Sequence, residues 1–106
     1  MTKPLKLRPL ADLDWAEHFN YLADRSPAAA RRFYEGIEES LVRVRADPDI
    51  GMRIELLGHE GDDLRALKPR AFPKYLIFYW IREDAVYILR ILHSAQEWKA
   101  ILKTTN

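Results

Sequence analysis

The chain has 106 residues, of which 48% are hydrophobic and 31% are charged, and its formal net charge at pH 7 is +1. This composition is typical of one ordinary globular domain, here spanning residues 1–106, and is far from the strongly basic balance of nucleic-acid-binding domains. The absence of cysteine excludes disulfides, thiol catalysis and cysteine metal sites. The longest apolar run has seven residues, whereas a membrane helix needs about 20. No N-terminal segment resembles a signal peptide, so we expect a cytoplasmic protein.

The first half of the chain predicts a short strand followed by two helices. Residues 3–9 alternate, with Leu5 and Leu7 on one side, and prolines limit the strand at both ends. Asp12 is expected to cap the first helix, and Ser26-Pro27 to end it and open a second helix that stops at Asp47-Pro48. The apolar faces of the two helices comprise Trp15, Ala16, Phe19, Leu22 and Ala23, and Ala30, Phe33, Ile37, Leu41 and Val44. Two amphipathic helices with a two-residue break form an αα-hairpin.

The second half predicts strands. Residues 49–63 are interrupted by glycines and are expected to be irregular, and residues 64–67 form a short strand. Residues 75–81 and 85–92 are rich in β-branched and aromatic side chains and are separated by the polar residues 82–84, which predicts a hairpin of two strands. Both faces of residues 75–81 are apolar, which is typical of a central strand covered on both sides.

The C-terminal residues predict a short helix. Ser94 and Glu97 have the spacing of a capping box, which would open a helix with Trp98, Ile101 and Leu102 on its inner face. Residues 104–106 are expected to be frayed. The fold class is therefore α+β: an N-terminal strand, the αα-hairpin, a three-stranded antiparallel meander and the short helix. We expect a mostly antiparallel sheet with the hairpin on one face and incomplete cover on the other, and such uncovered apolar surface commonly marks a partner site.

Arg90 is the one charged residue inside the last predicted strand. It either pairs with an acid such as Asp63, Glu83 or Glu97, or faces an anion, since a buried unpaired guanidinium is costly. His93, at the end of that strand, either has a structural role or serves in proton transfer or phosphate contact. It shares no metal-ligand spacing with the other histidines, so no metal site is expected. No nucleophile elbow and no glycine-rich phosphate loop occurs, which favours a binding protein over an enzyme.

An ordered set of short motifs resembles the ParE branch of the RelE/ParE toxin superfamily. The motifs are residues 26–30 (SPAAA), 47–51 (DPDIG), 64–65 (LR), 75–79 (YLIFY) and 88–93 (ILRILH). The resemblance covers nearly the whole chain. It implies a small bacterial toxin of a type II toxin–antitoxin pair, held in a hetero-oligomer by a ParD-like antitoxin whose tail wraps the helical hairpin and the sheet. It also implies DNA gyrase as the target, whereas RelE-like relatives cut messenger RNA in the ribosome.

The residues favour the branch without nuclease activity. RelE-like members use basic residues over the sheet and often a Tyr or His near the C-terminus, and this chain has nothing chemically versatile after His93. The basic residue common in the family after the last strand is replaced by Gln96, beside Glu97, and an acid there would repel a phosphate. Two alternatives stay open: a ribosome-dependent endoribonuclease, and a degenerate toxin that serves only as an antitoxin-binding module.

The resemblance, with the surplus of basic residues between positions 65 and 74, gives two sets of candidate site residues. The target-facing set is Arg65, Lys68, Arg70, Arg82, Arg90 and His93. The antitoxin-binding set is Trp15, Phe19, Leu22, Phe33, Tyr75 and Tyr79. No cofactor, metal, membrane or sequence-specific nucleic-acid contact is expected.

Overall fold

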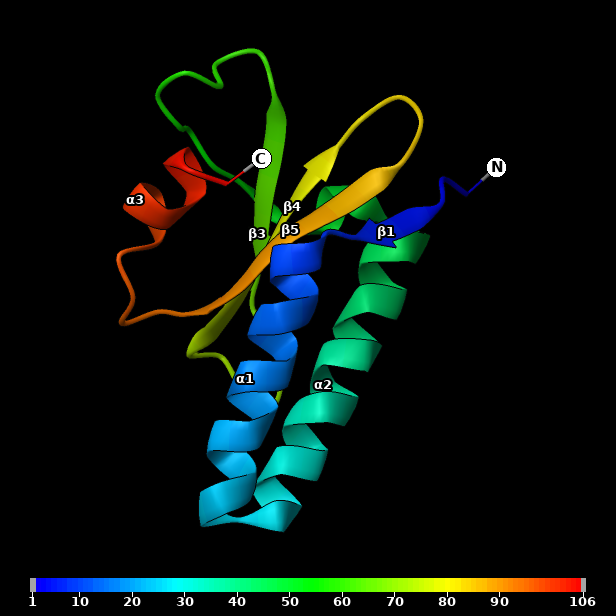
Figure 1. Ribbon diagram of the computed structural model, residues 1–106. Helices are drawn as coiled ribbons and strands as arrows, with labels where there is room; N and C mark the ends of the chain where they lie inside the picture. Colours follow the sequence, from blue (N-terminus) through cyan, green and yellow to red (C-terminus); the bar gives the residue numbers. More distant parts are fainter. Residues whose placement is uncertain (1, 106) are drawn as a thin grey trace.

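A computed structural model describes residues 2–105 as a five-stranded sheet with a helical hairpin and a short C-terminal helix (Figure 1). The strands are β1 (Leu5–Leu7), β2 (Met52–Arg53), β3 (Asp63–Leu67), β4 (Tyr75–Ile81) and β5 (Val86–His93), and the helices are α1 (Pro9–Arg25), α2 (Pro27–Ala46), the 3-10 turn η1 (Pro48–Ile50) and α3 (Trp98–Lys103). The strand order is β1-β5-β4-β3-β2. The predicted α+β fold, with β4 at the centre of the sheet, is confirmed.

Two features of the sheet go beyond the prediction. β1 pairs in parallel with β5, so that the sheet is mixed, although β3, β4 and β5 form the expected antiparallel meander. Met52 and Arg53 form β2, inside the segment expected to be irregular. β2 escaped the sequence analysis because two exposed residues produce no alternation of polar and apolar side chains.

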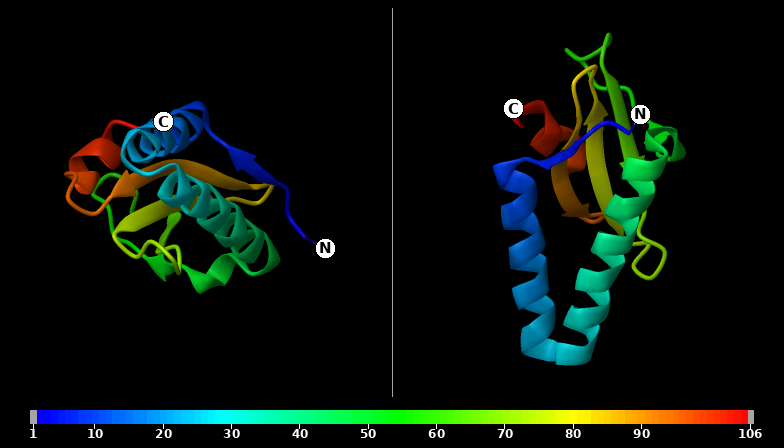
Figure 2. Two further views of the ribbon diagram at one scale, coloured as in Figure 1. Left: turned by 90° about the horizontal axis from the view of Figure 1, so that it is seen from below. Right: turned by 90° about the vertical axis from the view of Figure 1, so that its right-hand side faces the viewer.

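The helical hairpin extends well beyond the sheet at its connection (Figure 2). α1 starts at Pro9, not after Asp12: Arg8 is extended at the N-cap position and Pro9 occupies the first turn, which suits its fixed φ. The expected capping role of Asp12 was therefore wrong, and its carboxylate instead lies in the first turn. The break at Ser26 is confirmed, since the Ser26 hydroxyl accepts a hydrogen bond of 3.2 Å from the Ala29 N–H.

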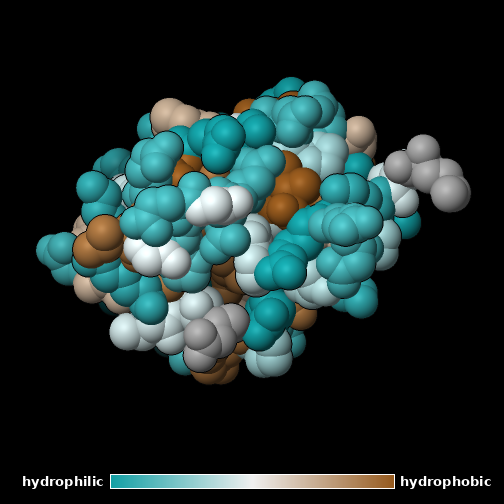
Figure 3. Space-filling view, turned by 90° about the horizontal axis from the view of Figure 1, so that it is seen from above, coloured by the Kyte–Doolittle hydropathy of each residue, from teal (hydrophilic) through white to brown (hydrophobic). Residues whose placement is uncertain are grey.

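The sheet separates two apolar cores. On the hairpin side, Tyr75, Ile77 and Tyr79 of β4 pack against α1 and α2. On the other side, Phe78 and Leu92 pack under α3, which Figure 1 places across the strands from α2. The expectation that both faces of β4 are apolar is confirmed. Viewed from above, the surface is largely hydrophilic and its apolar residues form separate patches (Figure 3).

The C-terminal segment corrects two expectations. α3 starts at Trp98 rather than at Ser94, because the Ser94 N–H donates to Lys74 O (2.6 Å) and the Gln96 side chain accepts from the His93 N–H (2.7 Å), so that residues 94–97 form a turn. Thr105 is not frayed: only 7% of its surface is exposed and its hydroxyl donates to Ile101 O at 2.8 Å. The expectation for Asn106 lies outside the described residues.

Candidate functional site

The C-terminal half of β5 is an open sheet edge covered by side chains of α1. β1 pairs only with residues 86–88 of β5. Beyond them, the Ile91 N–H donates to Asp14 Oδ2 (3.0 Å), and Nε2 of His18 lies 2.9 Å from Ile91 O. A carbonyl oxygen can only accept, so this Nε2 carries the proton. Two side chains one helical turn apart thus satisfy the backbone groups that an edge strand would bind.

Arg90 belongs to the same arrangement. The register of β4 against β5 shifts between Phe78 and Tyr79, and this bulge makes Leu89 the extra residue. The Arg90 guanidinium donates from Nε to Asp14 Oδ2 (2.7 Å) and from Nη2 to Asp14 Oδ1 (2.8 Å). This bidentate pair raises the pKa of Arg90, and the two side chains are only 17% and 7% exposed. Arg90 therefore has a carboxylate partner, but the partner is none of Asp63, Glu83 and Glu97.

Arg65 anchors the segment that follows α2 to the sheet. Its Nη1 donates to Asp49 O (2.9 Å) and Gly51 O (3.0 Å), and its Nε donates to Asp63 Oδ1 (3.0 Å). The Tyr79 hydroxyl joins the same segment, since it donates to Pro48 O at 2.6 Å and accepts from the Gly51 N–H at 2.8 Å. A Cβ at Gly51 would overlap the Tyr79 ring, which explains the glycine. Arg65 and Tyr79 are thus committed to holding this segment.

Replacing Tyr79 by phenylalanine tests this role. The change leaves the buried Gly51 N–H and the Pro48 carbonyl without their partner, so we expect a loss of about 1–3 kcal/mol in the free energy of unfolding at neutral pH. Urea denaturation of the variant and the wild type measures the loss. Tyr87→Phe is the matched control. It removes a hydroxyl that binds the exposed Asp84 side chain, and we expect little effect on stability. Equal stability of Tyr79→Phe and the wild type would contradict the anchoring role.

The same tyrosine predicts a loss of stability in alkali. Burial is the main cause that raises the pKa of Tyr79 and of Tyr75. Stability from a raised pKa is present below the value of an unfolded tyrosine, about 10, and is lost as the pH rises through the higher folded value. Denaturation at increasing pH should therefore show a decline above about pH 10, and Tyr79→Phe should reduce that decline. A decline of the same size in the variant would assign it to other groups.

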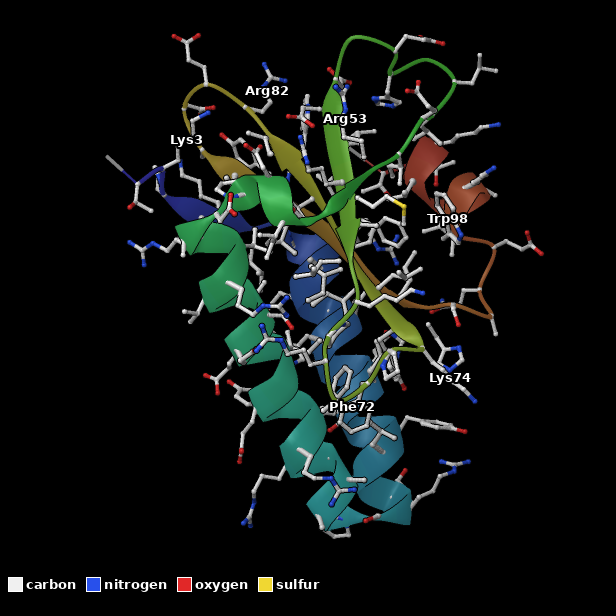
Figure 4. The ribbon with its side chains drawn as sticks, turned by 180° about the vertical axis from the view of Figure 1, so that it is seen from behind. Lys3, Arg53, Phe72, Lys74, Arg82 and Trp98 are labelled. Atoms are coloured by element: carbon white, nitrogen blue, oxygen red, sulfur yellow. The ribbon has the colours of Figure 1, made fainter. Side chains whose placement is uncertain are left out.

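The remaining target-facing candidates do not converge. Lys68 and Arg70 are exposed on the turn after β3, where Arg70 Nη1 lies 3.4 Å from Glu39 Oε1. Arg82 lies at the other end of the strands, with its guanidinium 4.1 Å from the centre of the Trp80 ring. Figure 4 shows this separation, with Phe72 and Lys74 at one end and Arg82 at the other. His93 is half-buried, and its Nδ1 accepts from the Ala95 N–H at 3.1 Å.

The antitoxin-binding candidates divide into core and surface residues. Phe33 and Tyr79 are fully buried and Tyr75 is 8% exposed, so all three are core residues. Trp15, Phe19 and Leu22 are half-buried. The three lie on the apolar face of α1 together with the buried Ala11. Helical periodicity alone does not separate the residues in the middle of this face from those at its border.

Trp15 and Phe19 line a hairpin groove between α1 and α2. It consists of two hollows of about 250 and 590 Å³. Both contain Phe19 and Tyr34, whose ring lies 4.8 Å from Trp15 and 6.0 Å from Phe19. The other lining residues are Asp12, Ala16 and Asn20 in the first hollow, and Ala23, Pro27, Ala30, Arg31, Glu35 and Glu38 in the second. Tyr34, which is 44% exposed, was not among the residues expected at this surface from the sequence.

A sheet-side pocket of about 310 Å³ lies on the opposite face, between the sheet, α3 and residues 54–62. Its apolar lining is Leu56, Leu64, Trp80, Leu89 and Leu102, and its polar lining is Arg8, His59 and Thr105. His59 is held by Asp62, with 2.8 Å between Nδ1 and Oδ2. α3 is thus too short to cover this face of the sheet completely.

Residues 2–105 contain neither a candidate metal site nor a membrane-spanning helix. No group of three or more His, Asp or Glu side chains in that range could hold a metal ion. No helix in it is long and apolar enough to cross a bilayer.

The chain is similar to proteins of one known family. The family model described as ParE toxin of type II toxin-antitoxin system, parDE, matches residues 5–98. Among solved structures, the chain is similar to the chromosomal ParDE TA system from P. aeruginosa, with a TM-score of 0.71 and 17% identity over 87% of this chain and 96% of that chain. At this identity the likeness shows the fold alone. None of the curated proteins matches the chain significantly.

Proposed function

The chain belongs to the ParE toxin family of type II toxin–antitoxin systems, and we propose that it acts by binding and poisoning DNA gyrase in the bacterial cytoplasm. The observation that supports a binding mechanism is that Arg65 and Arg90 both bind groups of this chain and hold the fold together. RNA cleavage needs cationic groups gathered on one phosphate and a proton-transfer group within hydrogen-bond reach. Here two of the candidate cations bind this chain's own carboxylates and carbonyls, and the others lie at opposite ends of the strands.

We propose that the exposed members of the target-facing set contact gyrase. These are Lys68, Arg70 and Arg82, with half-buried His93 at the same end of the strands as Lys68 and Arg70. Arg65 and Arg90 act as positioning residues, since their guanidinium groups hold η1 and α1 against the strands. Their substitution should reduce toxicity only in proportion to the loss of folded protein.

The proposed antitoxin is a ParD-like protein that forms a hetero-oligomer with this chain. Its support is the pair of apolar surfaces on opposite faces, the hairpin groove and the sheet-side pocket. Contiguous apolar surface of this kind commonly marks a protein interface. Of the antitoxin-binding set, Trp15, Phe19 and Leu22 are the members that a partner can reach, because the other three are core residues.

Gyrase assays with the purified chain test the proposal. We expect DNA supercoiling by gyrase to be inhibited and cleaved DNA to accumulate, while messenger RNA on programmed ribosomes stays intact. Arg82→Ala should weaken the inhibition without lowering the melting temperature, and Arg45→Ala, an exposed cation on α2, is the matched control. Cleaved message with unaffected supercoiling would establish the endoribonuclease alternative. Absence of both effects, and of a growth defect on induction, would leave the antitoxin-binding module.

A further inference from the structure

The exposed side of α2 carries a stripe with a regular chemical order. Pro27, Arg31, Tyr34, Glu38 and Val42 follow one another at steps of three and four residues, so they lie along one side of the helix. All five are exposed, with Tyr34 at 44% and Val42 at 68%. The stripe therefore has the Tyr34 ring at its centre and an apolar residue at each end. A cation lies on one side of the ring and an anion on the other.

The two charges have no ion-pair partner in the part of the chain that the structure describes. Arg31 and Glu38 make no ion pair within residues 2–105, whereas Arg43 and Arg70 both approach Glu39 on a neighbouring side of the helix. Both side chains line the larger hollow of the hairpin groove. A cation one turn before Tyr34 and an anion one turn after it are available to a partner that presents the opposite charges in the opposite order.

A second copy of the same chain presents that order. If two α2 helices cross antiparallel about a two-fold axis beside Tyr34, Arg31 of each copy faces Glu38 of the other. Pro27 of each copy then faces Val42 of the other. Such a self-complementary patch is the requirement for an isologous dimer. α2 has 20 residues and is about 30 Å long, so the contact can extend along the whole groove.

The shape of the groove agrees with this arrangement. Tyr34 is a projecting ring between the two hollows, supported by its stack on Trp15. The larger hollow beside it is lined in part by the small residues Ala23, Pro27 and Ala30. In the antiparallel arrangement, the two Tyr34 rings lie beside each other at the two-fold axis, and Val42 of each copy faces the small residues at the Pro27 end of the other copy's hollow.

We propose that the hairpin groove is a homodimer interface, in which the α2 stripes of two copies pair antiparallel through Arg31 and Glu38. One consequence rests on the proposed function: an antitoxin that binds Trp15 and Phe19 in the same groove and the second copy exclude each other. The antitoxin would then convert a toxin dimer into a toxin–antitoxin complex. The dimer itself depends on neither the antitoxin nor gyrase.

Analytical ultracentrifugation of the purified chain over a range of concentrations tests the dimer. The wild type should associate as its concentration rises. Arg31→Glu and Glu38→Arg should each raise the dissociation constant by about tenfold or more, because each reversal places like charges together at two symmetry-related contacts. An equimolar mixture of the two variants should recover the wild-type affinity, since every contact in the mixed dimer again joins opposite charges. Arg32→Glu, an exposed reversal outside the stripe, should have no effect.

Three results would overturn the inference. A wild type that is monomeric at every concentration would leave the groove to another protein, such as the antitoxin or a basic helix of the target. Association that survives both reversals would place the interface elsewhere. Failure of the mixed variants to associate would exclude the antiparallel pairing. Circular dichroism and melting temperatures establish that each variant is folded. If the chain did not inhibit gyrase, the proposed function would fail, but none of these outcomes for the dimer would change.

Discussion

Replacing Asp14 by alanine should lower the free energy of unfolding by about 3–5 kcal/mol, because it leaves the Arg90 guanidinium buried without its counter-charge. Asp14 accepts two hydrogen bonds from Arg90 and a third from the Ile91 N–H, and its side chain is 7% exposed. The substitution therefore removes an ion pair and uncovers the open edge of β5 at once. Urea denaturation followed by circular dichroism measures the change.

Variants on both sides of the pair sharpen this test. Glu17→Ala removes an exposed acid from the same helix and should change stability by less than about 0.5 kcal/mol. Arg90→Ala should also destabilise, since Asp14 then keeps only the Ile91 N–H. Its loss of toxicity should follow its loss of stability. A stable Arg90→Ala variant without toxicity would instead make Arg90 a target-facing residue, and equal effects of Asp14→Ala and Glu17→Ala would contradict the structural role.

The elements of the fold were predictable where one local signal was strong. β4 and β5 follow from two apolar runs, and the helical hairpin follows from Ser26-Pro27 between two amphipathic stretches. The short elements were not: β2 has two residues, and the start of α1 depends on Pro9, which equally suits the end of a strand. The packing of Thr105 depends on tertiary contact, which a local pattern does not contain.

The partners of the charged residues were the least predictable part of the site. Arg90 was recognised as a charge that needs an explanation, but Asp14 lies 76 residues away in the chain. One signal could have identified it: Asp14 is an acid on the helical face that carries Ala11 and Leu22. Arg65 gave no such signal, because its acceptors are mainly backbone carbonyls of a segment without regular periodicity.

The groove was only half predictable. Trp15 and Phe19 stood out as aromatic residues of an apolar face, and Tyr34 did not because it falls beside the apolar face of α2, next to Glu35. Sequence alone also cannot separate Phe19 from Phe33, since both recur at helical spacing on an apolar face. Their burial differs because Phe33 points at the sheet and Phe19 lies at the border of the hairpin.

Phe33→Ala should lower the free energy of unfolding by about 3–5 kcal/mol, which is the range for a fully buried phenylalanine. The Phe33 ring lies among those of His18, Phe72 and Tyr75, with centroid distances of 6.1, 5.6 and 4.8 Å, so its removal opens a cavity where the hairpin meets the sheet. Phe19→Ala should cost only about 1 kcal/mol, because the ring is already partly in water. Urea denaturation of both variants measures the difference.

For binding of the cognate antitoxin, we expect the reverse order: Phe19→Ala has the larger effect and Phe33→Ala the smaller. Phe19→Ala removes a wall shared by both hollows of the hairpin groove and should weaken antitoxin binding by about tenfold or more while the chain stays folded. Phe33→Ala should affect binding only through the fraction of unfolded chain, which titration calorimetry at low temperature can distinguish. If Phe19→Ala destabilised the chain as much as Phe33→Ala, Phe19 would be a core residue. If Phe33→Ala stayed stable and lost the antitoxin, the assignment of Phe33 to the antitoxin surface would hold after all, and the groove between the helices would have to open on binding to expose it.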